Sequence, residues 1–110
     1  MHEMRLNDEP FILIKNGSKT IELRLNDEKR RQIKVGDTIT FTNRSNNEQI
    51  SVVVINLHKY DSFEELYKNF DKISMGYKEN EIADPKDMEL YYSKEEQDKY
   101  GVVGIEIKLL

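Results

Sequence analysis

The pattern of apolar and polar positions along the chain predicts four β-strands. Residues 20–25 and 38–42 alternate between apolar and polar side chains, and residues 102–110 alternate again near the end of the chain. A period of two is the repeat of a strand, whose successive side chains point to opposite faces. Residues 50–57 are mostly apolar, so we expect the middle of this strand to be covered on both faces, as in a barrel with a further layer outside. Turn residues 43–47 join it to the preceding strand as a β-hairpin.

Capping residues and helical spacing predict helices in the segments outside these strands. Asp8 is a good N-cap, Pro10 suits a first helical turn, and Gly17 is a typical helix terminator, so one helix is expected to precede the first strand. Ser62 and Ser93 are each followed three residues later by a glutamate. This spacing is that of a capping box, and it indicates two further helix starts.

The remaining segments complete a one-domain plan over residues 1–110. Asp84-Pro85 indicates another helix start, and the charged stretch 26–32 is expected to be a short exposed helix or loop. Residues 71–83 show no clear periodicity and are expected to form an ordered loop. A chain of 110 residues supports one modest core. The order of elements is helix, strands, helices and closing strand, which indicates the α+β class.

The charge balance limits the size of any anion-binding surface. Lys and Arg total 17 against 21 for Asp and Glu, which gives a formal net charge of -4. Binding to duplex nucleic acid normally requires a basic face, so this balance argues against a broad phosphate-binding surface. It is compatible with a small basic pocket that takes one nucleotide or a short single strand.

Other compositional features predict a cytoplasmic protein that does not bind a membrane. No apolar run reaches the length of a membrane span, and the N-terminal residues lack the apolar core of a signal peptide. The chain contains no cysteine, which excludes disulfides, thiolate nucleophiles and cysteine-ligated metals.

We expect neither a metal nor a cofactor. His2 lies near the terminus in a segment expected to be mobile, and His58 lies at the end of a predicted strand. Neither histidine has a second metal ligand at a suitable spacing. The five glycines are scattered, so they form neither a P-loop nor a dinucleotide-binding fingerprint. No serine lies in a nucleophile elbow, which argues against hydrolysis by a catalytic triad.

Three charged residues mark the start of the first predicted strand. Alternation places Glu22 and Arg24 on one face, roughly 6–7 Å apart along the strand, and Lys19 lies just before them beside Gly17. One interpretation is a ladder of ion pairs on the exposed face of an edge strand, which contributes about 0–1 kcal/mol. The other is a clamp in which Glu22 orients the cations, whose free donors hold a phosphate, a carbonyl or a developing oxyanion.

The tyrosines also allow two interpretations. Tyr91 and Tyr92 cannot both face the core from one helix, and Tyr60, Tyr77 and Tyr100 lie near the ends of predicted elements. Tyrosines commonly pack at the boundary of a core with their hydroxyl groups toward water. They also serve as stacking platforms for bases in proteins that bind single-stranded nucleic acids.

The residues Gly17, Lys19, Glu22 and Arg24 match every fixed position of the motif Gly-x-Lys-x-x-Glu-x-Arg. In this motif the chain resembles the activating signal cointegrator homology (ASCH) domain family. The resemblance extends over nearly the whole chain through residues 34–37, 41–43, 62–63, 91–93 and 100–105. It implies a small β-barrel of about five or six strands with flanking helices, like that of the PUA RNA-binding domains, and a cleft lined by the motif residues.

The resemblance also implies a ligand and an alternative activity. The implied ligand is RNA, a nucleotide or a modified nucleoside, bound in the cleft by Gly17, Ser18, Lys19, Thr20, Glu22 and Arg24. Some bacterial relatives are amidohydrolases that remove the acetyl group from acetylcytidine, and some members are ribonucleases. The amidohydrolases use a lysine that matches Lys19, a threonine nucleophile three residues later, and a glutamate from farther along the chain. Here Glu22 occupies the place of that threonine, and several acidic residues in the segment 71–81 could supply the glutamate.

Three functional hypotheses therefore stand beside one another. The first is a module that binds a nucleobase, nucleotide or short RNA end. The second is a hydrolase acting on a nucleoside amide or on RNA, with Lys19 and Glu22 as its catalytic proton-transfer pair and Glu22 acting on water. The third is an adaptor that binds a protein partner; its binding should depend less on salt than phosphate binding does. The sequence leaves the oligomeric state open.

Overall fold

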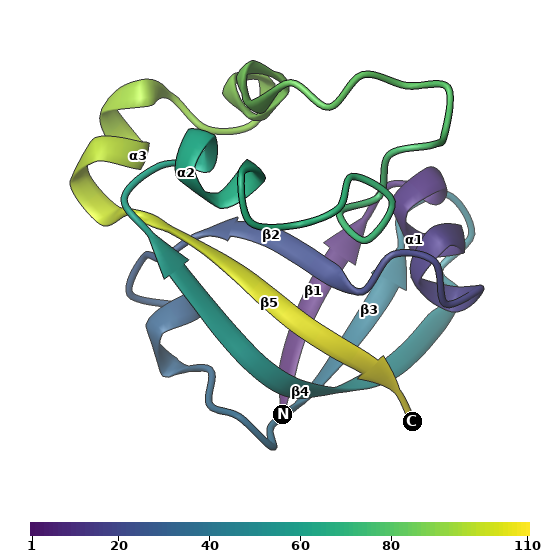
Figure 1. Cartoon of the computed structure of the whole chain (residues 1–110). Coiled ribbons are helices and arrows are strands. Elements are labelled where there is room, and N and C mark those ends of the chain that lie inside the picture. Colours follow the sequence, from purple (N-terminus) through teal and green to yellow (C-terminus); the bar gives the residue numbers. More distant parts are fainter.

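A computed structural model describes all residues from 1 to 110 and contains one five-stranded sheet with helices around it (Figure 1). The strands are β1 (His2–Leu6), β2 (Ile21–Leu25), β3 (Thr38–Asn43), β4 (Gln49–Tyr60) and β5 (Val102–Leu109). The α-helices are α1 (Asp8–Lys15), α2 (Phe63–Tyr67) and α3 (Lys94–Tyr100). Two short 3-10 helices, η1 (Arg30–Gln32) and η2 (Pro85–Leu90), complete the structure. This arrangement confirms the predicted α+β class.

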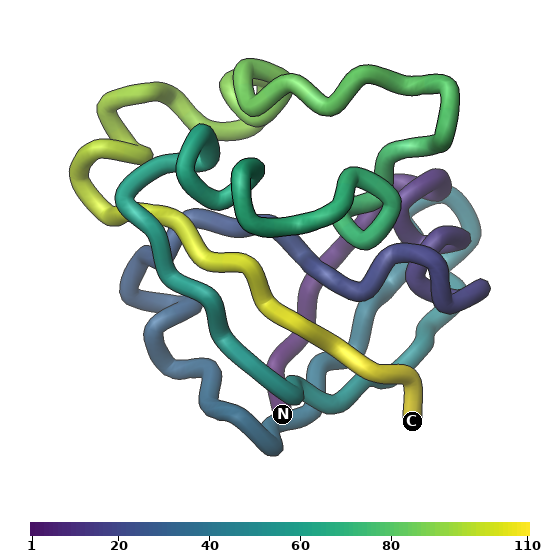
Figure 2. The backbone as a smooth tube through the Cα atoms, in the orientation of Figure 1, coloured from purple at the N-terminus to yellow at the C-terminus, as the bar shows by residue number.

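The sheet curls into an open half-barrel, as the backbone trace in Figure 2 shows. This shape is consistent with the expected small PUA-like barrel. Its strand order is β1-β3-β4-β5-β2, in which β1 and β3 are parallel and all other neighbours are antiparallel. The edge strands β1 and β2 approach each other at the open side, where Arg24 Nη2 donates to the Arg5 carbonyl oxygen at 3.4 Å. We call this opening the seam of the half-barrel.

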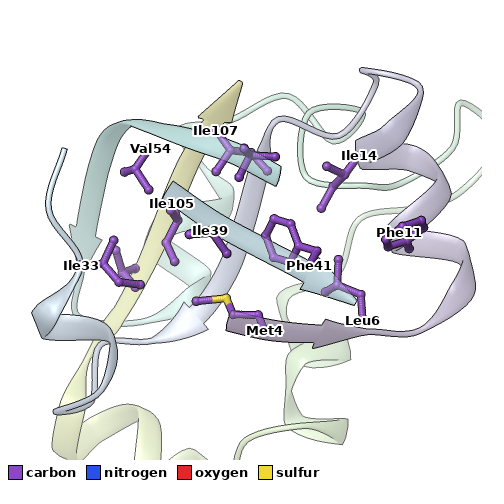
Figure 3. Close-up of a cluster of buried hydrophobic side chains, with 12 residues drawn as sticks. Met4, Leu6, Phe11, Ile14, Ile33, Ile39, Phe41, Val54, Ile105 and Ile107 are labelled. Carbon is purple, nitrogen blue, oxygen red and sulfur yellow. The ribbon is translucent and has the colours of Figure 1, made fainter. Parts of the chain in front are cut away.

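The concave face of the sheet holds the larger hydrophobic core (Figure 3). Twelve buried side chains form it, with Phe11 and Ile14 contributed by α1. The predicted helix after the first few residues is confirmed, but its N-cap is Asn7, and Asp8 is the first helical residue. The Asp8 carboxylate accepts a hydrogen bond from Asn43 Nδ2 at 2.9 Å, which ties α1 to the end of β3.

A second cluster covers the other face of β2 and β5. Its eight buried residues include Phe63 and Leu66 of α2 together with Met75 and Met88. Since β2 and β5 are covered on both faces, the layer formed by α2, η2, α3 and the loop 71–83 lies outside the half-barrel (Figure 1).

Two sequence-based expectations need correction. The middle of β4 is covered on one face only, because Val54 is buried while Ile55 is 45% exposed at a bulge between Val54 and Asn56. The segment around His2 is a strand, and the His2 imidazole pairs with the Asp37 carboxylate at 2.8 Å. The physical reason is that β1 gains its order from parallel pairing with β3, a contact between distant parts of the chain.

The remaining elements follow the predictions with shorter bounds. The Ser93 capping box is present and opens α3, whereas α2 ends at Tyr67 and the segment after Asp84 winds as the 3-10 helix η2. Residues 71–83 form turns and loop without a helix or strand. None of the helices has the length and apolar character needed to cross a membrane.

Candidate functional site

Lys19, Glu22 and Arg24 form one buried charged cluster at the start of β2. Alternation along β2 puts Glu22 and Arg24 on the same face, as predicted, and the turn after α1 brings Lys19 beside them. The Lys19 Nζ lies 3.4 Å from Glu22 Oε1, and Arg24 Nη2 lies 2.7 Å from Glu22 Oε2. The side chains of Lys19 and Glu22 are each only 6% exposed, so the interpretation as an exposed ladder is wrong.

The loop after α2 completes the surroundings of Lys19. The Lys19 Nζ donates to the Met75 carbonyl oxygen at 2.9 Å, and the backbone N–H groups of Thr20 and Ile21 donate to the Ser74 carbonyl oxygen. Gly76 follows with φ +104, and a Cβ built on it would lie 3.0 Å from Lys19 Cδ. This close approach requires glycine and holds the lysine between the loop and β2.

The electrostatics of the cluster follow from burial and from the two opposite charges around Glu22. Burial disfavours the ammonium form and lowers the pKa of Lys19, although Glu22 partly opposes this effect. Burial alone would raise the pKa of Glu22, but Lys19 and Arg24 outweigh it and lower that pKa below its ordinary value. Glu22 in turn outweighs the effect of burial on Arg24 and raises its pKa. The carboxylate and guanidinium therefore remain charged at neutral pH.

The lowered pKa of Glu22 predicts an acid-sensitive contribution to stability. A carboxyl group whose folded-state pKa lies below its ordinary value of 4.5 stabilises the fold above that value, and this contribution disappears as the pH falls through the folded-state pKa. We expect the difference in unfolding free energy between the wild type and Glu22→Gln to shrink below about pH 4.5. Urea unfolding between about pH 7 and about pH 3 measures it; a constant difference would contradict this linkage.

The charged cluster lies at the floor of a pocket of about 670 Å³ at the seam of the half-barrel. Tyr67, Tyr77, Tyr91 and Tyr92 line its walls together with Met75, Gly76 and Met88. The Tyr67 and Tyr77 hydroxyl groups lie 2.9 Å apart, and the Tyr77 hydroxyl donates to Asp87 Oδ2 at 2.8 Å. Burial raises the pKa of Tyr67 and of Tyr77, which keeps both hydroxyl groups protonated. The pocket therefore combines aromatic walls with a charged floor.

The structure brings only part of the predicted residue set into this pocket. Lys19, Glu22 and Arg24 line it, whereas Gly17, Ser18 and Thr20 do not. Gly17 follows the end of α1 with φ +87, and the Ser18 hydroxyl donates to Asn16 Oδ1 at 2.7 Å. The role of all six residues in ligand contact stays a prediction.

The tyrosines fall into two groups by their positions, and their stacking on a base stays a prediction. Tyr60 and Tyr100 pack against the second hydrophobic cluster and do not line the pocket. Tyr92 lines the pocket and also stacks on Phe63, with ring centroids 6.1 Å apart. Tyr91 lines it with 64% of its surface exposed.

Sequence reasoning missed several polar residues at the pocket. Arg5, Arg30, Arg44 and Asp87 line it. Glu81 lines it too, and it belongs to the segment 71–81 that was considered as the source of the family's glutamate. Arg5 comes from β1, which was not expected, although Met4 and Leu6 alternate with Glu3 and Arg5 as in a strand. Arg44 stands in the predicted hairpin turn, a position where charged residues usually face solvent.

Comparisons with known proteins support the fold and identify the family. The family model described as the ASCH domain matches residues 4–110. The crystal structure of the hypothetical protein PH0355 has 37% sequence identity and a TM-score of 0.82, with 98% of this chain and 97% of that chain covered. The solution NMR structure of protein PF0455 from Pyrococcus furiosus has 37% identity and a TM-score of 0.72, with 99% and 96% covered. Among curated proteins, none matches the sequence significantly. The chain belongs to the ASCH domain family.

Proposed function

We propose that the pocket binds a base of RNA, or of a nucleotide or modified nucleoside, between its tyrosine walls and its charged floor. Membership in the ASCH family supports RNA binding in general. The observation that carries the specific proposal is the buried Lys19–Glu22–Arg24 cluster at the floor of an aromatic pocket. The volume of about 670 Å³ lies within the range of small-molecule and cofactor sites.

The floor offers both kinds of hydrogen-bonding group that the edge of a base requires. Arg24 Nε donates to Glu22 Oε2 at 2.8 Å, and Arg24 Nη2 lies near Glu22 Oε2 and the Arg5 carbonyl oxygen. The Tyr92 hydroxyl also contacts the Arg24 guanidinium. The Lys19 ammonium group donates to the Met75 carbonyl oxygen and pairs with the Glu22 carboxylate. Its third proton is then available to a ligand. The Glu22 carboxylate can accept from an exocyclic amino group. Such paired donors and acceptors favour a base over a purely apolar ligand.

The same pocket favours binding over the amidohydrolase reaction. An acyl-enzyme route needs a hydroxyl or thiol nucleophile beside its base, and the pocket lining contains no serine, threonine or cysteine. Its only hydroxyl groups belong to tyrosines, and the raised pKa values of Tyr67 and Tyr77 make them poor nucleophiles. Glu22 occupies the place of the family's threonine, and its lowered pKa makes it a weak base toward water. Formation of cytidine from acetylcytidine, with loss of that activity in Glu22→Gln, would replace the binding proposal with the hydrolase alternative.

Replacement of Tyr91 by alanine should weaken the binding of short RNAs and nucleosides without destabilising the fold. Tyr91 lines the pocket, is 64% exposed and makes no side-chain hydrogen bond, so its removal leaves the core unchanged. Stacking of a base on an aromatic ring contributes about 1–3 kcal/mol, which corresponds to roughly 5- to 150-fold in affinity. Titration of the protein with pentaribonucleotides and nucleosides, followed by NMR, measures the change.

Leu90→Ala provides the matched control for this experiment. Leu90 is the neighbouring residue, is 84% exposed and does not line the pocket. Its replacement should leave affinity unchanged. Equal affinities of the wild type and Tyr91→Ala for every base would show that Tyr91 does not stack on the ligand.

A further inference from the structure

A second hollow continues from the pocket along the outer side of the seam. Its volume is about 620 Å³, and it shares Arg5, Arg24, Arg30 and Arg44 with the pocket. Lys29 adds a fifth basic side chain, whereas Glu3 is the single carboxylate and Met4 the single apolar residue of its lining. The protein as a whole has a formal net charge of -4, so this local excess of positive charge is opposite in sign to the net charge of the chain. We call this hollow the arginine groove.

The strand pairing explains why the arginines meet. β1 and β3 run parallel in a register that places Arg5 opposite Thr42, and the Arg44 backbone N–H donates to the Leu6 carbonyl oxygen at 2.9 Å. Arg5 and Arg44 therefore leave neighbouring strands at the same end of the sheet. Both residues are exposed, and neither makes a side-chain hydrogen bond or an ion pair with the protein.

Arg30 adds a third guanidinium group to the groove, and an ion pair within the protein uses only part of it. Its Nη1 lies 2.9 Å from Asp27 Oδ2, but its Nε is buried without any acceptor. A buried donor without an acceptor carries an energetic penalty. Arg24 differs, because Glu22 already neutralises it.

The two hollows differ in their carboxylates, and this difference favours one orientation of a ligand. Glu9, Glu81 and Asp87 line the pocket but not the arginine groove. A phosphate is repelled by these carboxylates and attracted by Arg5 and Arg44, which line both hollows and extend into the arginine groove. A base in the pocket therefore directs its phosphate along the seam toward Arg5 and Arg44.

We propose that the arginine groove binds the phosphate attached to the nucleoside whose base occupies the pocket. The ligand class is then a phosphorylated nucleotide or an RNA strand. A free nucleoside has the base that the pocket binds but lacks the phosphate that the arginine groove binds. This inference rests on the proposed function of the pocket, and it adds a second subsite to it. Arg5 and Arg44 are the principal phosphate contacts, because they have no partner within the protein.

The test compares four ribonucleosides, their 5′- and 3′-monophosphates and a mixed pentaribonucleotide as probes for the wild type and the double variant Arg5→Gln, Arg44→Gln. We expect the wild type to bind a phosphorylated probe at least about tenfold more tightly than the matching nucleoside. The double variant should lose this preference for phosphorylated probes. The affinity of the double variant for the pentaribonucleotide should depend less steeply on salt concentration. The decrease in slope should correspond to the loss of about one to two phosphate contacts. The monophosphates distinguish a terminal phosphate from the phosphodiesters of a strand.

The double variant Lys94→Gln, Lys108→Gln is the matched control. It removes the same number of positive charges from exposed positions that line neither hollow. Equal binding of nucleosides and phosphorylated probes, with NMR shifts at the pocket, would overturn the phosphate subsite and leave the pocket function intact. Equal losses in the two double variants would also overturn it, since net charge alone would then explain the effect. Phosphate binding without shifts at the pocket, or no binding of any probe, would overturn both proposals.

Discussion

Replacement of Glu22 by glutamine should lower the free energy of unfolding by about 3–5 kcal/mol, the usual effect of removing one partner from a buried ion pair. Glu22 is 4% exposed and uses separate oxygens for Lys19 and Arg24. Glutamine keeps the shape of the side chain but leaves the Arg24 guanidinium without its counter-ion. Lys19 can release its proton because its pKa is already lowered, whereas Arg24 cannot. Urea unfolding of both proteins at neutral pH measures the difference.

Glu65→Gln is the control for an exposed ion pair. Glu65 pairs with Lys68 at 3.2 Å, and both side chains are more than half exposed, so this change should alter stability by no more than about 0–1 kcal/mol. Lys19→Met gives a second comparison, since the double variant Lys19→Met, Glu22→Gln removes two of the three buried charges. Its destabilisation should be smaller than the sum of the two single changes. Similar values for Glu22→Gln and Glu65→Gln would show that the buried cluster does not support the fold.

The contact between Glu22 and Arg24 could be predicted from the sequence, because strand alternation is a local property. Two residues separated by one position share a face in any strand. The burial of the cluster could not be predicted in this way. It depends on Met75 and Gly76, which lie more than fifty positions along the chain from Lys19 and were part of a segment without periodicity. The position of the site therefore followed from the motif, and its surroundings only from the structure.

The fold shows the same division between local and distant signals. Helix α1, the hairpin of β3 and β4, and the capping box of α3 each depend on neighbouring residues, and all three were predicted. Strand β1 depends on parallel pairing with β3, a contact over more than thirty positions. Because β1 was not predicted, the positions of Arg5 and of one side of the seam were not predicted either. The arginine groove could not be predicted from the sequence, because its residues come from separate segments of the chain.

The seam explains why polar residues can gather in the interior of so small a domain. A closed barrel would pair the edges of β1 and β2 with each other, whereas here the strand order ends at both. The N–H groups at the start of β2 bond to the Ser74 carbonyl oxygen, and the Arg24 guanidinium bonds to a carbonyl oxygen of β1. The loop and the charged cluster thus satisfy backbone groups that a neighbouring strand would otherwise pair. The pocket occupies the space that this incomplete closure leaves.

Replacement of Gly76 by alanine should reduce both stability and ligand affinity. Gly76 has φ +104, a conformation that residues with a side chain rarely adopt, and such strain typically costs about 1–3 kcal/mol. The added Cβ would also lie 3.0 Å from Lys19 Cδ and 3.3 Å from Lys19 Nζ. Relief of these contacts moves the ammonium group away from Glu22 and the pocket floor. We expect affinity for a pentaribonucleotide to fall about tenfold or more, as loss of one charge-assisted hydrogen bond would produce.

Gly36→Ala separates the two effects. Gly36 has φ +94, so alanine meets a similar backbone strain there, but no atom lies within 4 Å of the added Cβ, and Gly36 does not line the pocket. Both variants should therefore lose stability in urea unfolding, while only Gly76→Ala should lose affinity. Equal affinities of the two variants would mean that Lys19 can shift without affecting the ligand. In that case the floor of the pocket would depend on Glu22 and Arg24, and the contact between Gly76 and Lys19 would serve the fold alone.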